Sequence, residues 1–135
     1  MVKVPELPDL DAPQLEWDAY FSAIERNKKL RQENPYVLHL IKVLWPRGER
    51  GLRRIDVIDR IFQTRFPTGL NIPKEFEKTV QSAYNHHCWH SSVFQRRNGK
   101  PEEELFYPVG GKGSGIWAVN RERAAVWLRN HQFES

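Results

Sequence analysis

The spacing of the apolar residues changes once along this chain, and that change limits the folds it can adopt. Up to residue 90, apolar residues recur three and four positions apart, the period of a helix with one buried face. From residue 93 they form short runs bounded by Gly, Asn and Pro, a pattern typical of strands and turns. Residues 121–132 return to a helical pattern. This order predicts a mainly helical α+β fold with a small β region.

Four helices are expected before the change, over about 11–33, 34–46, 52–66 and 73–90. Asp11 and Gln14 have the spacing of a capping box for the first helix, and Asn34 followed by Pro35 favours a start for the second. The residues expected to face the core are, helix by helix, Trp17, Tyr20, Phe21 and Ile24; Val37, Leu40, Ile41 and Leu44; Ile55, Ile58, Ile61, Phe62 and Phe66; and Phe76, Val80, Ala83, Tyr84 and His87.

Three short strands are expected in the β region. Residues 93–97 and 105–109 have the pattern of a hairpin around the turn 98–101, and residues 116–119 form a third strand after the glycine-rich segment 110–115. Two helices, a loop, a longer polar-faced helix and a β ribbon follow one another in a winged helix, a variant of the helix-turn-helix. We therefore expect a winged helix with an extra N-terminal helix and a C-terminal helix that packs through Ala124, Val126 and Trp127.

Charge divides the chain into an acidic beginning and a basic remainder. Residues 1–33 hold 5 Lys/Arg and 7 Asp/Glu, a net of −2, whereas residues 34–135 hold 16 and 10, a net of +6. We expect an acidic arm and helix over 1–33 and the winged-helix domain over 34–135. The positive charge of the second part favours an anionic partner such as nucleic acid.

Length and composition favour one domain in a reducing compartment. The chain has 135 residues, 39% of them hydrophobic, which is enough for one buried core. It has no long apolar run, and its acidic, proline-containing start does not resemble a secretory signal. Cys88 is the only cysteine, which excludes an internal disulfide. We expect a cytoplasmic protein that does not enter a membrane.

The polar face of the fourth helix predicts contact with double-stranded DNA. It combines cations, which reach guanine or phosphate, with amides, which can bond adenine bidentately. Basic residues at the expected hairpin and at the glycine-rich turn would hold phosphates. Any surface helix has a similar composition, so a merely solvated face is the alternative. The predicted DNA-binding residues are Lys74, Lys78, Gln81, Ser82, Asn85, Arg96, Arg97, Lys100 and Lys112.

We find no pattern that predicts a catalytic residue, a metal site or a cofactor. His86 and His90, four apart on the expected helix, could share a metal with Cys88, but no second cysteine, HExxH or CxxC accompanies them. The acidic run 102–104 is expected to be a solvated turn rather than the carboxylate cluster of a nuclease. The segment 110–115 lacks the GxxxxGK[ST] pattern of a phosphate loop.

Residues 34–120 resemble the winged-helix domains associated with bacterial restriction endonucleases and, more distantly, the HARE-HTH class. The likeness is carried by the sequences FEKTVQ at 76–81, SSVF at 91–94, LFY at 105–107 and, most distinctively, GSGIWAV at 113–119. The resemblance implies a non-catalytic DNA-binding protein linked to bacterial restriction or defence. It also implies that Trp117 is structural and packs on the helices.

An interaction module is the second hypothesis for this chain. Winged helices also bind proteins, so the same surface could dock a larger nuclease or methyltransferase of a restriction system. The first 33 residues favour this alternative because their acidic arm would be repelled by DNA and Trp17, Tyr20 and Phe21 could anchor a partner. The N-terminal helix could equally join two copies of the chain in a homodimer.

Overall fold

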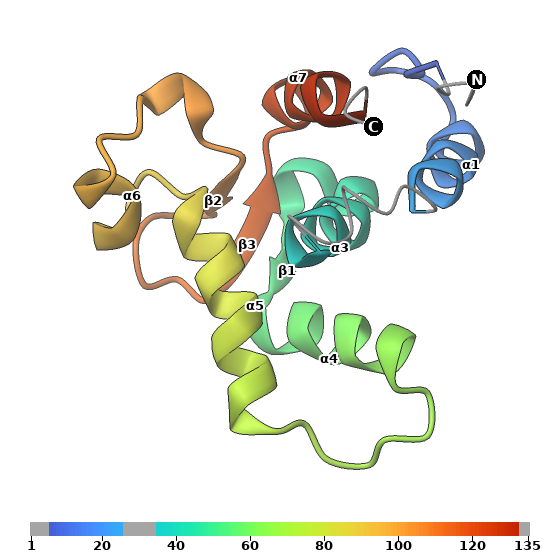
Figure 1. Ribbon diagram of the computed structural model, residues 1–135. Coiled ribbons are helices and arrows are strands. Elements are labelled where there is room, and N and C mark those ends of the chain that lie inside the picture. The colour runs from blue at the N-terminus through green and yellow to red at the C-terminus, as the bar shows by residue number, and fades with distance from the viewer. Residues whose placement is uncertain (1–5, 26–34, 133–135) are drawn as a thin grey trace.

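The computed structural model describes residues 6–25 and 35–132 and is mainly helical, with one small sheet (Figure 1). This confirms the expected α+β class. In chain order the elements are α1 (Gln14–Ile24), α3 (Pro35–Leu44), the 3-10 helix η1 (Trp45–Arg50), β1 (Leu52–Arg53), α4 (Arg54–Arg65), α5 (Lys74–His86), α6 (Ser92–Arg96), the 3-10 helix η2 (Pro101–Glu103), β2 (Phe106–Pro108), β3 (Ile116–Val119) and α7 (Arg121–Gln132). Within the described ranges, no helix has the length and hydropathy to cross a membrane.

The sheet is antiparallel, with the strand order β1-β3-β2. Leu52 pairs with Trp117 at one edge, and Phe106 pairs with Val119 at the other. Strands β2 and β3 form a hairpin whose turn, residues 109–115, contains the glycine-rich segment 110–115, and the Val109 N–H donates to the Ile116 carbonyl at 2.9 Å to close it. The strand predicted over 116–119 and the closing helix predicted over 121–132 have these same bounds in the structure.

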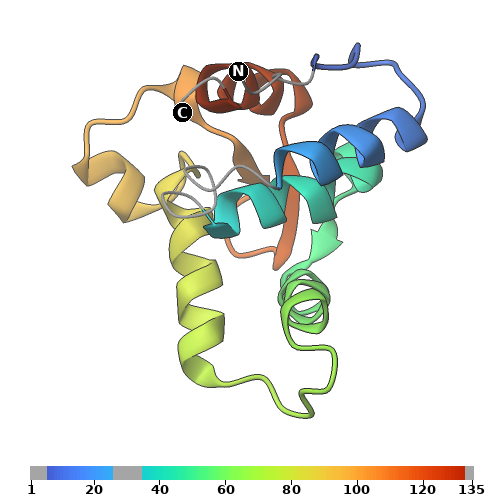
Figure 2. The ribbon, with the colours of Figure 1, turned by 45° about the vertical axis from the view of Figure 1, so that its right-hand side comes forward.

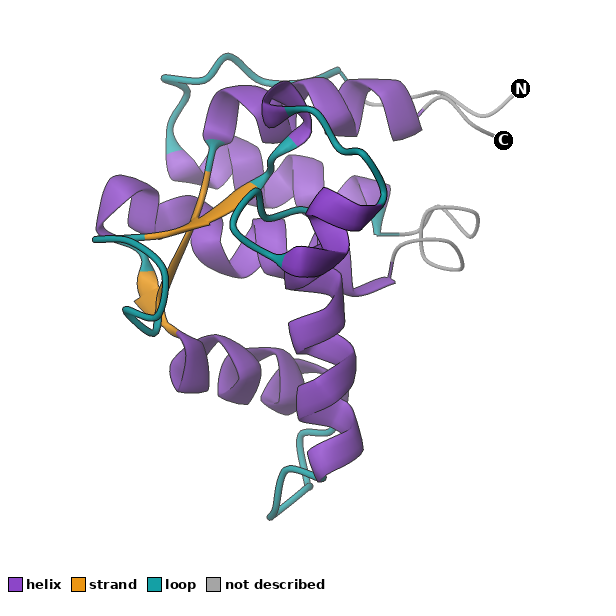
Figure 3. Cartoon of the chain, turned by 90° about the vertical axis from the view of Figure 1, so that its left-hand side faces the viewer, coloured by secondary structure: helices purple, strands orange, loops and turns teal. Residues whose placement is uncertain are grey.

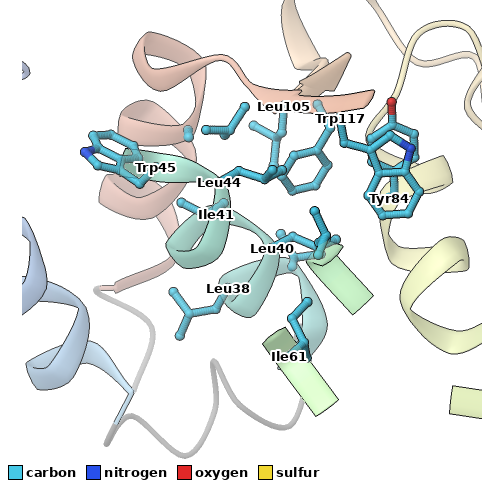
Figure 4. Packing of buried hydrophobic residues seen from close by; sticks show 14 of the residues in the cluster. Leu38, Leu40, Ile41, Leu44, Trp45, Ile61, Tyr84, Leu105 and Trp117 are labelled. Carbon is cyan, nitrogen blue, oxygen red and sulfur yellow. The ribbon is translucent and has the colours of Figure 1, made fainter. Parts of the chain in front are cut away.

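Helix α3 lies at the centre of the core (Figure 4). Its buried residues point in several directions and meet α4, α5 and β3, as expected of a helix that is apolar on more than one face. Leu40, Ile41 and Leu44 are fully buried, and Trp117 and Leu105 close the core from the β region. Trp117 thus has the structural position that the resemblance implied.

Helix α1 packs into the same core as the rest of the described chain (Figure 2). Its stripe of Trp17, Tyr20, Phe21 and Ile24 is buried as predicted. The Trp17 ring lies 4.1 Å from the Trp45 ring, centroid to centroid, and its indole nitrogen donates to the Asp9 carbonyl at 3.0 Å. Rings in contact at such distances contribute beyond their buried area, so α1 is held by a cluster of aromatic side chains.

The predicted strand at 93–97 is wrong, because this segment is the short helix α6. The Ser91 side chain accepts the Phe94 N–H at 3.1 Å, which is an N-cap bond. Only Phe94 of this segment is fully buried, and a single buried side chain can be supplied by one helical turn. Asn98, with φ 57°, ends the segment in the left-handed conformation common after helices. The hairpin of this fold is β2–β3 instead.

The helix predicted over 52–66 begins two residues later in the structure, at Arg54, because Leu52 and Arg53 pair with β3. The inward face was also misassigned at its ends. Ile55 is 61% exposed and Phe66 is 45% exposed, whereas Val57, which was not predicted to face the core, is fully buried. Val57 lies one helical turn before the buried Ile61, and Phe66 is the C-cap residue of α4, with a non-helical backbone.

Other predicted helix ends also differ from the structure. Helix α5 stops at His86 rather than at residue 90, because the His87 carbonyl accepts the N–H groups of Leu105 and Phe106 and so draws the chain towards β2. Helix α1 has Pro13 at its N-cap with no side-chain cap, so the capping box from Asp11 is wrong. The predicted extension over 26–33 and the Asn34 cap lie outside the described residues.

In the last helix, α7, the packing residues were predicted in part. Ala124 is fully buried and Trp127 packs against the core at its edge, but Val126 is 53% exposed. Helix α7 therefore covers the core with one face only, and Val126 lies on the other.

Candidate functional site

The outward face of α5 lines a surface hollow together with the start of α4 and one residue of α6. Its lining residues are Arg54, Lys74, Glu77, Lys78, Gln81, Ser82, Asn85 and Val93. This set contains all five residues of α5 predicted to bind DNA. Three cations and one carboxylate make the hollow net positive. The periodicity that placed the predicted residues on one face of α5 is therefore confirmed, although what binds there is a separate question.

Three side chains in this hollow form a chain of hydrogen bonds, which we call the Arg54–Gln81–Asn85 relay. Arg54 Nε donates to Gln81 Oε1 at 2.6 Å, and Gln81 Nε2 donates to Asn85 Oδ1 at 2.9 Å. The Arg54 guanidinium carbon lies 6.0 Å from the centroid of the Trp117 ring. The relay therefore joins α4 to α5 and holds two polar side chains of the face in defined positions.

The cations on the outer part of α5 are less constrained. Lys78 Nζ lies 3.7 Å from a Glu75 carboxylate oxygen, and the two side chains are largely exposed. Such an exposed pair contributes little to stability and is screened by salt, so Lys78 can exchange it for another anion. Lys74 is exposed at the first turn of α5. Ser82 is also exposed, and its carbonyl lies 2.7 Å from the His86 imidazole Nδ1.

The β2–β3 turn lies beside the start of α4, across from α5 (Figure 3). The Arg54 N–H donates to the Gly115 carbonyl at 2.8 Å and so ties the turn to α4. Gly110, Gly111, Gly113 and Gly115 all have positive φ, and a side chain added at any of them would meet open space. Lys112 is exposed within this turn. The turn therefore presents backbone groups and one cation with no side chains crowding them.

The predicted hairpin of residues 93–97 and 105–109 is absent from the structure, because helix α6 takes the place of its first strand. The three basic residues assigned to it, Arg96, Arg97 and Lys100, therefore do not lie at a hairpin. Arg96 and Lys100 are exposed on and after α6. Arg97 Nε donates to the His86 carbonyl at 3.1 Å, and its guanidinium stacks 4.5 Å above the Phe94 ring. A cation on the last carbonyls of a helix stabilises that helix end. Arg97 therefore has a structural role at the end of α5.

The buried side of α5 is anchored by stacked rings. Tyr84 and Trp117 lie nearly parallel, with ring centroids 4.0 Å apart, and the Phe106 ring also stacks on Tyr84, with centroids 5.8 Å apart. Burial is the main reason why the pKa of the Tyr84 phenol is raised, and the neighbouring Cys88 thiol acts in the same direction. This stack sets the height of α5 over the sheet, and with it the position of the outward face.

The segment after α5 does not have the geometry expected for a shared metal. His86 and His90 are four positions apart in the sequence, but they do not lie on one helix, because α5 ends at His86. Cys88 is buried, and burial raises the pKa of its thiol. Over residues 6–25 and 35–132, no three His, Cys, Asp or Glu side chains gather as metal ligands would.

The acidic run after α6 is only partly a solvated turn. Glu102 and Glu103 are exposed as expected. The Glu104 side chain is 14% exposed, and its carboxylate accepts the Trp89 N–H at 2.6 Å. Glu104 thus holds the chain that leaves α5, which is a tertiary contact that local sequence does not predict.

Arg54 was not among the residues predicted for the candidate site. Its link to Gln81 joins residues that are 27 positions apart, so no local spacing indicates it. Comparison of the chain with protein-family models, with curated proteins and with solved structures gave no match.

Proposed function

We propose that this chain is a winged-helix protein that binds double-stranded DNA through the outward face of α5. A winged helix has a helix, a short strand, two further helices and a β-hairpin, and its first strand pairs with the last strand of the hairpin. The order α3, β1, α4, α5, β2 and β3, with the sheet order β1-β3-β2, supports this assignment. In such a fold α5 is the recognition helix and the β2–β3 turn is the wing.

The single observation that carries the proposal is the polar, net positive hollow on α5 beside the glycine-rich β2–β3 turn. An α-helix fits the major groove, where amides and cations contact base edges. In this arrangement Lys74 and Lys78 contact phosphates or bases from α5, and Lys112 contacts the backbone from the turn. The protein positions itself on DNA and carries out no chemistry. A role linked to restriction or defence remains a prediction from the resemblance.

The alternative of a protein-docking module loses one of its arguments. Trp17, Tyr20 and Phe21 were proposed as anchors for a partner, but all three are buried in the chain's own core. Their use by a partner would require α1 to leave the aromatic cluster around Trp45. The interaction of this chain with a restriction-system protein stays a prediction without a defined anchor.

Fluorescence anisotropy with a duplex of random sequence tests the proposal. The wild type should bind with an affinity that falls steeply as salt rises, because counterions are released when phosphates are contacted. The Lys78→Ala/Gln81→Ala/Asn85→Ala variant should lose at least about tenfold in affinity. Arg129→Ala in α7 removes the same one positive charge from an exposed residue outside the hollow, and it should bind nearly as well as the wild type.

Two results would overturn this assignment. One is a wild type that does not bind duplex at low salt. The other is an equal effect of the triple variant and of Arg129→Ala, which would mean that only total charge matters and that α5 is not the contacting element.

A further inference from the structure

The hydrogen-bond polarity of the relay indicates which base the site would read. Resting on the DNA-binding function proposed above, we propose that the hollow recognises the acceptor edge of guanine, O6 and N7, through donors that include Arg54. The sequence had suggested adenine as the target of Gln81 and Asn85, and it had not included Arg54 among the contacts.

Arginine determines the orientation of both amides. A guanidinium has N–H donors and no acceptor, so the Gln81 atom at 2.6 Å from Arg54 Nε must be the amide oxygen. The Gln81 nitrogen then faces Asn85, and the Asn85 atom at 2.9 Å from it must in turn be the oxygen. The assignment of oxygen and nitrogen, which is otherwise ambiguous for amides, therefore follows from chemistry alone.

Within the relay, the groups that remain unpaired are mainly N–H donors. The Asn85 amide nitrogen, the second N–H of Gln81 and the Nη groups of Arg54 have no partner in the described part of the chain. Each amide oxygen already uses one of its two lone pairs on a bond within the relay. Bidentate reading of adenine needs one amide to present its oxygen and its nitrogen together, whereas guanine presents two acceptors. A surface of unpaired donors is complementary to the guanine edge.

The relay also holds the Arg54 side chain in place. Its Nε is engaged by Gln81, and its guanidinium lies near the Trp117 ring, which is itself buried and stacked on Tyr84. An arginine held in this way loses less conformational entropy on binding, which favours specific contact over loose charge attraction.

The test uses wild-type protein with chemically altered DNA, so it does not depend on the folding of a variant. Preferred sites are first selected from duplexes with a randomised central segment, and they should be enriched in guanine. Affinity for a selected duplex is then measured after 7-deazaguanine replaces guanine at single positions, which removes the N7 acceptor. At one or two positions the affinity should fall on the order of tenfold.

A matched pair of variants assigns the contact to Arg54. Arg54→Met removes the guanidinium and releases both amides, and it should become insensitive to 7-deazaguanine. Arg53→Met removes the same charge from the adjacent residue, which is 69% exposed and pairs with Asp56 at 2.9 Å outside the relay. This control should retain the wild-type sensitivity. Both variants are checked for folding by circular dichroism.

The outcomes separate the two proposals. A wild type that binds no duplex overturns the DNA-binding function and this inference with it. Binding in which selected sites favour adenine, or in which 7-deazaguanine has no effect at any position, leaves the DNA-binding function intact and overturns the guanine assignment. Equal sensitivity of Arg54→Met and Arg53→Met overturns the role of Arg54.

Discussion

His87 links the fold to pH. Burial, followed by the nearby Arg97, His86 and His131, lowers the pKa of this imidazole from 6.5 to about 4. Its ring lies edge-on to Phe106 and Trp127, so the folded state favours the neutral form. The unfolded chain takes up a proton below pH 6.5 and is stabilised by it, whereas the folded chain is not.

The free energy of unfolding should therefore be constant above pH 7 and fall as pH drops through about 6.5 to about 4, by roughly 3 kcal/mol from His87. Burial also lowers the pKa of His39, which acts in the same direction. Urea unfolding of wild type and His87→Gln at several pH values isolates the His87 part. A His87→Gln variant with the same pH dependence as wild type would contradict this account.

Individual residues of the candidate site were predictable where they depend on one helix. The spacing of Lys78, Gln81 and Asn85 along α5 determines that they share a face. Gln81 and Asn85 are four positions apart, a spacing at which side chains on a helix can bond to each other. Arg54 was not predictable, because its place in the relay depends on how α4 crosses α5. The donor polarity of the site is therefore a tertiary property.

Among the elements, β1 depends on a single glycine. Gly51 precedes β1 with φ 69°, and a Cβ placed on it would lie 2.4 Å from the Trp117 carbonyl oxygen. Gly110, in the β2–β3 turn, has φ 83° and nothing within 4 Å of such a Cβ. Both positions disfavour L side chains, but only Gly51 is also crowded by backbone.

Alanine at the two glycines should have different effects. Gly110→Ala should lower the free energy of unfolding by about 1 kcal/mol through backbone strain alone. Gly51→Ala should lower it by more than about 3 kcal/mol, because the added methyl group pushes β1 away from β3. Urea denaturation of the two variants checks this, and equal losses would show that the β1–β3 contact is not tight at Gly51.

Elements with a strong local signal were predictable, and those set by tertiary contacts were not. Strand β3 and helix α7 follow from uninterrupted local patterns between clear turn residues. Strand β1 has only two residues and no pattern of its own, so it is recognisable only through its pairing with β3. Val93 and Phe94 favoured a strand, but the Ser91 cap and the left-handed Asn98 define a helix there.

The molecule as a whole places its aromatic core behind the candidate site. The Tyr84, Trp117 and Phe106 stack supports α5 from beneath, and α1 closes the far side of the core through Trp17 and Trp45. The outward face of α5 and the β2–β3 turn are left open to a partner. The acidic residues of α1 lie on a different part of the surface from the basic residues of the hollow. DNA bound at α5 would therefore not have to approach these acidic residues.

Backbone amide chemical-shift mapping, during titration of the labelled protein with a short duplex, tests this arrangement most directly. The account predicts that shifts concentrate in α5, at Arg54 and in the β2–β3 turn, and that they shrink as salt rises. Helices α1 and α7 should change little and serve as internal controls. Shifts confined to α1 or α7, or none at a saturating amount of duplex, would contradict the assignment of α5 as the DNA-contacting helix.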